Sequence, residues 1–115
     1  MQPNDFIEKY RIDKWLFAAR FFKTRSLAAE AVNRERVRIN DLPAKPAKEL
    51  RLGDNVALRQ DGGLVRTVIV RGLSAIRGPA TVAQTLYKET AESQAARAQA
   101  AEARRLAPEP AAAMT

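Results

Sequence analysis

The chain of 115 residues contains no cysteine and no histidine. Without cysteine there is no disulfide framework and no thiolate nucleophile, and without both residue types there is no zinc-finger-type site. Histidine is the side chain that exchanges protons near neutral pH, so acid–base catalysis would need a lysine or carboxylate with a strongly shifted pKa. We therefore expect no catalytic residue, no metal site and no cofactor, and a protein that is not an enzyme.

Two further kinds of segment are missing. The five glycines match neither a P-loop nor a dinucleotide-binding pattern. No apolar run approaches the ~18 residues of a membrane span, and the first five residues do not resemble a signal peptide. We expect a cytoplasmic protein that has no contact with membranes.

Positive charge is abundant and unevenly distributed. The chain has 20 lysines and arginines against 13 acidic residues, a net charge of +7. Between Lys9 and Arg38 there are nine basic and three acidic residues, so most of the surplus lies in the first third of the chain. Such a patch is typical of a surface that binds a polyanion. A solvated basic face that keeps the protein soluble is the ordinary alternative, and charge alone favours it.

The apolar spacing predicts two short helices. One begins near Ile12, with its apolar stripe at i, i+3, i+4 and i+7. The other runs to about Asn33 and has either Thr24 or Ser26 as its N-cap. Because the connection is short, the two helices should form a compact hairpin. The apolar stripes that we expect to be buried are Ile12, Trp15, Leu16 and Ala19 in the first helix and Leu27, Ala28, Ala31 and Val32 in the second.

The middle of the chain has the alternation of a small β-sheet. Strands are predicted at 37–39, 56–58 and 64–70, with extended chain at 49–52. Turn residues separate them at Asn40-Asp41 and at Asp61-Gly62-Gly63, and Pro43 and Pro46 bracket a stretch that cannot be a central strand. We expect an α+β fold in which the helical hairpin packs on a small, mainly antiparallel sheet.

The ends of the chain are simpler. Residues 1–9 carry no periodic pattern and are expected to form a flexible leader. A helix from about Ala80 to Tyr87 should bury Val82 and Leu86, with Tyr87 as a further candidate. Residues 88–107 are predicted to form an Ala-rich C-terminal helix, which has too few large apolar residues to bury much and should either project from the body or fray. The segment 108–115, with Pro108 and Pro110, is expected to be disordered.

A candidate anion site lies at the start of the second helix. Free backbone N–H groups and the helix dipole favour a phosphate there, and Lys23-Thr24-Arg25-Ser26 adds hydroxyls and cations. Ordinary capping with two solvated cations is the alternative for these residues. Further cations that could extend the surface are Arg11, Lys14 and Arg20 on the first helix, Arg36 and Arg38 on a strand, and Lys45 and Lys48 in the proline-bounded loop.

Five of the seven aromatic residues lie between positions 10 and 22, among these cations. Aromatic rings can stack on unpaired bases. Trp15 shares the core stripe, whereas Phe17 and Phe21 lie nearly opposite it. Either those two rings are exposed for a partner, or the C-terminal helix covers them, and we favour covering. If they are exposed, the protein could instead be a protein-interaction adaptor that uses Phe17, Phe21 and the C-terminal helix.

The ordered series of these motifs resembles a known family. The segments are Arg11-Ile12-Asp13-Lys14-Trp15-Leu16, Ala18-Ala19-Arg20-Phe21-Phe22-Lys23-Thr24-Arg25-Ser26-Leu27-Ala28, Val37-Arg38-Ile39-Asn40, Lys45-Pro46-Ala47-Lys48 and Leu52-Gly53-Asp54. Together they resemble the alpha-L RNA-binding domain, named after ribosomal protein S-four of the small subunit. On this basis we assign the domain to 10–59, completed by a strand and helix at 60–87. The family usually has glycine where this chain has Arg34-Glu35, so either Asn33 supplies a left-handed turn or the path differs.

Within the family, the Asp13 to Leu16 segment, the segment 87–90 and the lack of an attached enzyme resemble the bacterial ribosome-associated heat-shock members. The resemblance implies binding to structured ribosomal RNA and to the free large ribosomal subunit carrying a stalled nascent chain on tRNA, in ribosome recycling under heat stress. Some DNA binding through phosphates and a monomeric free state are also expected. The resemblance implies that RNA is contacted by Arg11, Lys14, Arg20, Lys23, Thr24, Arg25, Ser26, Lys45 and Lys48.

Overall fold

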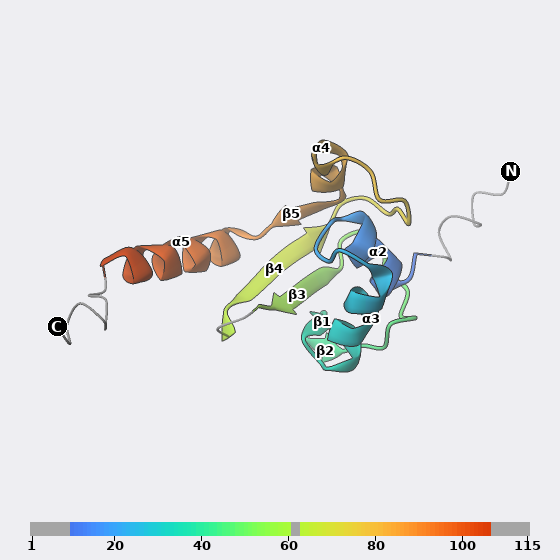
Figure 1. Ribbon diagram of the computed structural model, residues 1–115, viewed down its shortest axis with the longest axis horizontal. Coiled ribbons are helices and arrows are strands. Elements are labelled where there is room, and N and C mark those ends of the chain that lie inside the picture. The colour runs from blue at the N-terminus through green and yellow to red at the C-terminus, as the bar shows by residue number, and fades with distance from the viewer. Residues whose placement is uncertain (1–9, 61–62, 107–115) are drawn as a thin grey trace, which may run out of the picture.

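The computed structural model describes residues 10–60 and 63–106. The expected leader 1–9, the tip of the Asp61-Gly62-Gly63 turn and the expected tail 108–115 lie outside the described residues. The described chain forms a five-stranded antiparallel sheet in the order β2-β1-β3-β4-β5. The helices α2 (Ile12–Ala18) and α3 (Arg25–Asn33) lie side by side over this sheet (Figure 1). The expected α+β fold, a helical hairpin on a mainly antiparallel sheet, is confirmed.

The hairpin is held to the sheet by a compact core. Ile12, Trp15 and Leu16 of α2 are completely buried, and α3 contributes small buried residues, chiefly Ala28 and Val32. Small side chains let the two helix axes approach closely. The indole Nε1 of Trp15 also donates to the carbonyl of Gly72 at 2.8 Å, which ties α2 to the chain after β4. The expectation that Leu27 is buried was wrong: it lies at the flank of the stripe and is 47% exposed.

Both helices of the hairpin end in the same way. The N–H groups of Arg20 and Phe21 bond the carbonyls of Phe17 and Leu16, a Schellman motif, and Arg20 is left-handed with φ +67°. The corresponding bonds at the end of α3 run from Glu35 to Val32 and from Arg36 to Ala31, with Glu35 at φ +59°. Glu35, not Asn33, therefore supplies the turn that glycine usually makes in the family.

The sheet consists of β1 (Val37–Ile39), β2 (Leu42–Pro43), β3 (Asn55–Arg59), β4 (Val65–Val70) and β5 (Tyr87–Glu89). Asn40 and Asp41, both with positive φ, form the two-residue turn between β1 and β2. Pro43 is in the edge strand, where the sheet loses no hydrogen bond because of its missing N–H. The inward side chains of β1, β3 and β4, led by Val37, Val56 and Val68, complete the core.

The region after β4 departs from the prediction. The expected helix 80–87 is a single α-helical turn, α4 (Ala80–Ala83), followed by the 3-10 turn η2 (Gln84–Leu86) and then β5, which the prediction missed. Leu86 is buried as expected, but Val82 is 52% exposed. Pairing of residues 87–89 with β4 also means that the C-terminal helix begins at Ala91 rather than at 88.

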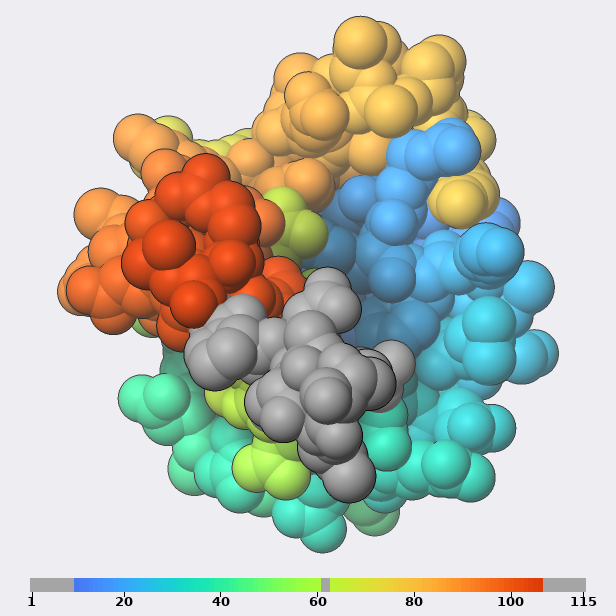
Figure 2. Space-filling model, turned by 60° about the vertical axis from the view of Figure 1, so that its left-hand side comes forward, coloured from blue at the N-terminus to red at the C-terminus, as the bar shows by residue number. Residues whose placement is uncertain are grey.

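Helix α5 (Ala91–Leu106) projects from the body, as its composition predicted (Figure 1). Its packing is confined to its first turns, where it contacts β4, and among its residues only Ser93 is buried. Figure 2 brings this side forward and shows the surface hollowed between α5 and the helical hairpin.

Candidate nucleic-acid interface

A buried carboxylate organises the start of the hairpin. Asp13 in α2 is 3% exposed and accepts hydrogen bonds from Arg11 through Nε at 3.1 Å and Nη2 at 2.9 Å. It also accepts the backbone N–H of Lys14 at 2.7 Å, and Nη2 of Arg25 lies 3.8 Å from Oδ2. One carboxylate thus draws cations from both helices to one place.

The start of α3 is the predicted anion site. Thr24 is the N-cap, and its hydroxyl accepts the N–H of Leu27 at 3.0 Å, which decides between the two cap candidates. The cap leaves the backbone N–H groups of Arg25 and Ser26 in the first turn, where helices have no internal acceptors for them. The side chains of residues 23–26 are all exposed. An anion could therefore meet these N–H groups and the cations Lys23 and Arg25 together.

The proline-bounded loop joins this place. Backbone N–H groups at the start of α2 bond carbonyls of the loop, Ile12 to Lys48 at 2.8 Å and Asp13 to Pro46 at 3.3 Å. The N–H of Lys48 in turn bonds the carbonyl of Lys45 at 2.9 Å. The exposed side chains of Lys45 and Lys48 are thereby carried beside the Arg11 end of α2, an association that the sequence left open.

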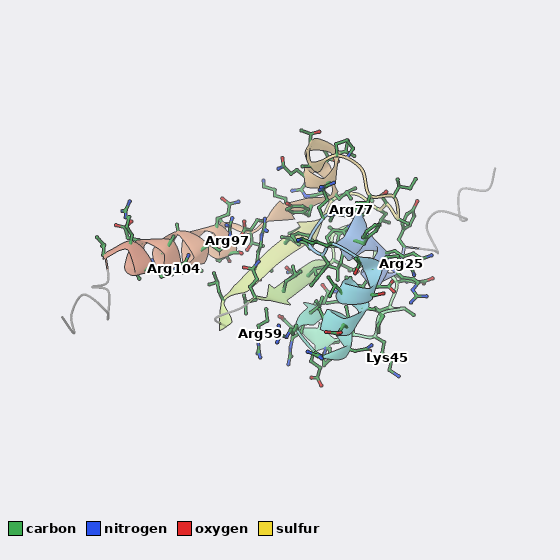
Figure 3. All side chains as sticks on the ribbon, in the orientation of Figure 1. Arg25, Lys45, Arg59, Arg77, Arg97 and Arg104 are labelled. Carbon is green, nitrogen blue, oxygen red and sulfur yellow. The ribbon has the colours of Figure 1, made fainter. Side chains whose placement is uncertain are left out.

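Arg20 lies at the other end of α2, where its exposed guanidinium donates to the carbonyl of Gly78 at 2.8 Å. In the same loop, the Arg77 guanidinium stacks 5.2 Å from the ring centroid of Phe17. Arg77 was missed from the sequence, because nothing local connects it to residues sixty positions earlier. Figure 3 shows Arg25, Arg77 and Lys45 on the side of the molecule that carries the hairpin.

The two remaining cation candidates do not join this surface. Arg38 lies between two buried residues of β1, so its exposed side chain is on the sheet face away from the hairpin, and its Nη1 lies 3.4 Å from the carbonyl of Asp41. Arg36 lines a groove at the opposite end of α3. We define the basic face as Arg11, Lys14, Arg20, Lys23, Arg25, Lys45 and Lys48.

The aromatic side chains have partners within the chain. The ring of Phe21 lies 5.9 Å from that of Trp15 and 4.7 Å from that of Tyr87, and the Arg66 guanidinium is 5.2 Å from its centroid. The expectation that the C-terminal helix covers Phe21 was wrong: the ring is partly covered, but by residues of α2, β4 and β5. Phe17 is half-buried, with Arg77 stacked on it.

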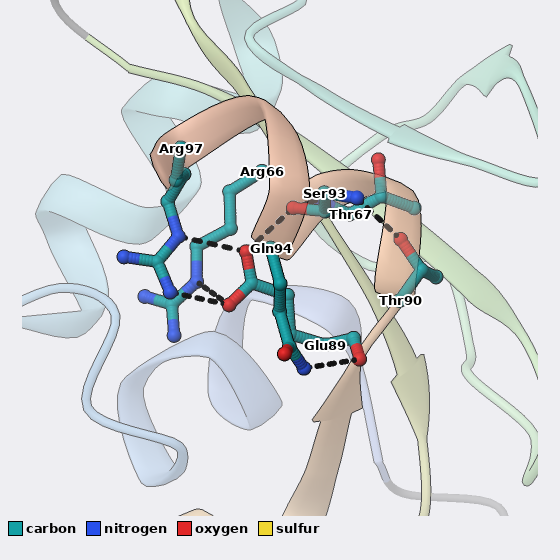
Figure 4. Close-up of polar contacts among 7 residues, drawn as sticks. All are labelled: Arg66, Thr67, Glu89, Thr90, Ser93, Gln94 and Arg97. Carbon is teal, nitrogen blue, oxygen red and sulfur yellow. Dashed lines mark hydrogen bonds and ion pairs between the residues drawn. The ribbon is translucent and has the colours of Figure 1, made fainter. Parts of the chain in front are cut away.

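A second buried carboxylate attaches α5. Glu89 accepts from Arg97 Nε at 2.8 Å and Nη2 at 2.6 Å, and from the Ser93 hydroxyl at 2.6 Å (Figure 4). Arg66 Nε lies 3.7 Å from Oε1. The hydrogen bonds from Arg97 lower the pKa of Glu89, with Ser93 and the charge of Arg66 acting in the same direction and burial opposing them. This cluster fixes the direction of α5 relative to the sheet.

Residues 10–60 and 63–106 hold neither a metal-binding cluster nor a membrane-spanning helix. No group of three or more acidic side chains there could hold a metal ion. No helix in the same ranges is both long and apolar enough to cross a bilayer.

Comparison with known proteins agrees with this geometry. The S4 domain, the family of the alpha-L motif, matches residues 11–56. The chain is thus an S4-domain protein whose match spans α2, α3 and the first strands, the part that carries the basic face.

Individual relatives identify the family within the S4-domain proteins more specifically. Heat shock protein 15 of Escherichia coli is 48% identical over 96 residues, which cover 84% of this chain and 71% of that protein. A solved trimeric structure of Heat Shock Protein 15 from Vibrio cholerae has a TM-score of 0.79 at 43% identity, covering 84% of this chain and 97% of the other. The RQC P-site tRNA stabilizing factor of Listeria monocytogenes is 32% identical over 80 residues, 69% of this chain and 87% of that protein. The chain belongs to the heat shock protein 15 family.

Proposed function

We propose that this protein is a non-enzymatic RNA-binding protein that holds structured ribosomal RNA on its basic face, chiefly through phosphates. The observation that carries the proposal is the placement of cations around Asp13 and the N-terminus of α3. Arg11 and Arg25 are drawn to one buried carboxylate, beside the capped first turn of α3. Cations that are already ordered lose less side-chain entropy when a phosphate arrives.

The physiological target is proposed from the relatives. One group of relatives is named for heat shock, and another for stabilizing a tRNA in the P site. Together with the S4 domain, these names support a role at the ribosome, and we propose that the target is the free large subunit carrying a stalled nascent chain on tRNA under heat stress. The protein would then act in the cytoplasm.

The contacts that we propose are those of the basic face together with Thr24 and Ser26 of the α3 start. Phosphate contacts carry no sequence information, so weaker binding to DNA through the same cations is expected. The solved Vibrio cholerae relative is trimeric. A monomeric free state for this chain remains our prediction, to be measured by sedimentation.

The proposal is tested with a variant that removes charge at the α3 start without burying a new carboxylate. Reversal of Arg25 would place a second carboxylate beside Asp13, so we choose Lys23→Glu with Arg25→Gln. Because phosphate binding releases counterions, affinity for purified large subunits at about 150 mM salt should fall at least tenfold, with a shallower salt dependence. The measurement is co-sedimentation over a series of salt concentrations.

The matched control is Lys88→Glu with Arg104→Gln. Both of its residues are exposed, and neither belongs to the basic face. It changes the net charge by the same amount, so it should keep most of the affinity. If both variants lose the same affinity, the loss depends on net charge alone. If Lys23→Glu with Arg25→Gln loses no affinity, the basic face is not the binding site.

A further inference from the structure

A groove lies between α3 and the end of β3, apart from the basic face. It has a volume of about 390 Å³, within the range of small-ligand pockets, about 300–1,000 Å³. None of the residues to which the family resemblance assigns RNA contact lines this groove.

The floor of the groove is apolar. Phe21 and Phe22 are partly buried and pack on the hydrophobic core, while Leu27 is 47% exposed and projects from α3. This explains the exposure of Leu27 that the helical stripe did not predict. An aromatic and aliphatic floor held by the core can support the face of a planar ring.

The rim of the groove is basic. Arg34, Arg36 and Arg59 line it, opposed among the lining residues only by Glu30. The backbone N–H of Arg59 bonds the carbonyl of Arg36 at 2.7 Å, so these two positions are held together. Arg34 pairs with Glu30 at 3.6 Å, but both side chains are more than half exposed, and such a pair is weak and readily exchanged.

A flat ring surface edged by cations matches an unpaired nucleotide. A base within a duplex hides its faces in the stack, whereas an unpaired base can lie on an aromatic side chain while arginines hold its phosphate. An apolar peptide segment would use the floor but would add no negative charge beside the basic rim. The excess of positive charge therefore selects single-stranded RNA as the occupant.

We propose that this groove is a second RNA subsite, which takes one unpaired nucleotide with its base on Phe22 and Leu27 and its phosphate between Arg34 and Arg59. The proposal rests on the proposed function, because the same RNA would be held at the basic face. Phe22 lies two residues before the α3 N-cap Thr24, so a strand leaving that site reaches the groove along α3. The protein would thereby favour structured RNA that carries a single-stranded extension.

The test compares two RNA probes on the full-length, ¹⁵N-labelled protein. One is a stable RNA hairpin with blunt ends, and the other is the same hairpin with a pentauridylate extension, which has little structure of its own. The extension should raise affinity about tenfold, since each stacked base and each phosphate contact adds to binding. Amide signals of Ala31 and Gln60 should shift only with the extended probe.

The variant Arg34→Gln with Arg59→Gln should lose that tenfold gain and still bind the blunt hairpin as the parent does. The control Lys88→Gln with Arg104→Gln removes the same charge from exposed positions away from the groove and should retain the gain. Because the one phosphate contact in the groove is lost, the salt slope for the extended probe should fall by about 0.7.

The outcomes separate the two proposals. If the blunt hairpin fails to bind, the proposed function is wrong. If it binds but the extension adds no affinity, or shifts no groove amide, the groove subsite is wrong. Concentration-dependent shifts of the groove amides without RNA would assign the groove to a second copy of the chain, and would also overturn the subsite.

Discussion

Asp13 connects two helices and the candidate RNA surface through one buried side chain. Its oxygens accept from Arg11 and from the backbone of Lys14, and they lie near Arg25. Replacing Asp13 with Asn keeps the size of the side chain but removes the charge that orders both arginines. The residue is therefore structural and indirectly functional, because it positions cations that phosphate would meet.

We predict that Asp13→Asn lowers the free energy of unfolding by about 2 kcal/mol, the usual scale for hydrogen bonds to a buried charged group. RNA affinity should fall as well, although the net charge becomes more positive. Urea denaturation and RNA titration measure the two effects. The control Asp41→Asn removes the same charge from an exposed turn, and equal behaviour of the two variants would show that the Asp13 contacts contribute nothing.

Glu35 is a second residue whose role depends on the backbone. Its φ of +59° completes the Schellman motif after α3, and a Cβ disfavours that conformation. We predict that Glu35→Gly raises the free energy of unfolding by about 0.5–1 kcal/mol. Glu35→Ala removes the same carboxylate and keeps the Cβ, so it should give no such gain in thermal melting. A gain of equal size in both variants would mean that charge, not backbone strain, is responsible.

At the scale of elements, the Glu89 cluster decides how α5 is attached. The carboxylate binds Arg97 and Ser93 of α5 and lies near Arg66 of β4. The helix has little other packing, since among its residues only Ser93 is buried. Removal of one partner of a buried, hydrogen-bonded charge leaves the others unpaired, which costs several kcal/mol in documented cases. The cluster is thus the main anchor of an otherwise exposed helix.

The cluster also predicts a pH dependence. The pKa of Glu89 is lowered from its ordinary value of 4.5, so the carboxylate stabilises the fold above about pH 4.5 and loses this contribution as the pH falls toward the lowered value. Glu89→Gln should reduce the free energy of unfolding by about 2 kcal/mol at pH 7. The difference between variant and parent should shrink steadily below pH 4.5. Chemical denaturation at several pH values tests this, and a difference that grows on acidification would contradict it.

Hydrogen exchange provides a separate readout of the same cluster. Exchange of the α5 amides should accelerate in Glu89→Gln, while the amides of β3 keep their protection, because the cluster holds α5 and not the core. The matched variant Glu102→Gln removes a carboxylate from the exposed part of α5. It should leave exchange in the first turns of the helix unchanged.

Elements whose own side chains face the core could be predicted from the sequence. The hairpin and the strands β1, β3 and β4 carry apolar residues at helical or alternating spacing, because each buries one face. Strand β5 has no such signal: Tyr87-Lys88-Glu89 is short and polar, and it becomes a strand because it pairs with β4 and because Arg97 and Ser93 satisfy Glu89. Long-range pairing of this kind leaves no local pattern.

The candidate site also has features that could be predicted from the sequence and features that could not. The cations at the α3 start were predictable, since the capping residues and the flanking basic residues are adjacent in sequence. The assembly of Lys45 and Lys48 beside Arg11 depends on backbone bonds between the loop and α2. Stacking of Arg77 on Phe17 and the groove below Leu27 depend on elements that meet only after folding. Sequence spacing therefore identified the kinds of residue better than it identified their arrangement.

At the scale of the whole molecule, the body and the projecting helix have separable roles. The basic face and the groove both lie on the body, whereas every residue of α5 from 101 to 106 is exposed. If the protein acts by binding RNA, the far part of α5 is not needed for affinity. If it were an adaptor, as the alternative interpretation of Phe17, Phe21 and the C-terminal helix would have it, that part of the helix would be required for its partner.

Truncation after Ala100 distinguishes these two functions without changing the side-chain charge. Residues 101–115 contain two arginines and two glutamates, so the surplus of +7 stays on the truncated chain. Ser93 and Arg97 remain to hold Glu89, and the free energy of unfolding should change by less than about 0.5 kcal/mol, as for other exposed sites. We predict that affinity for the large subunit stays within about threefold of the parent, measured by the same co-sedimentation.

A second truncation, after Thr90, provides the contrast. It removes both α5 partners of Glu89 and leaves that carboxylate with Arg66 alone, so the free energy of unfolding of the body should fall. The basic face itself is left unchanged. RNA affinity measured at low temperature, where the body stays folded, should therefore survive even this deletion. Loss of large-subunit binding in the Ala100 truncation, with its fold intact, would transfer the function from the basic face to the projecting helix.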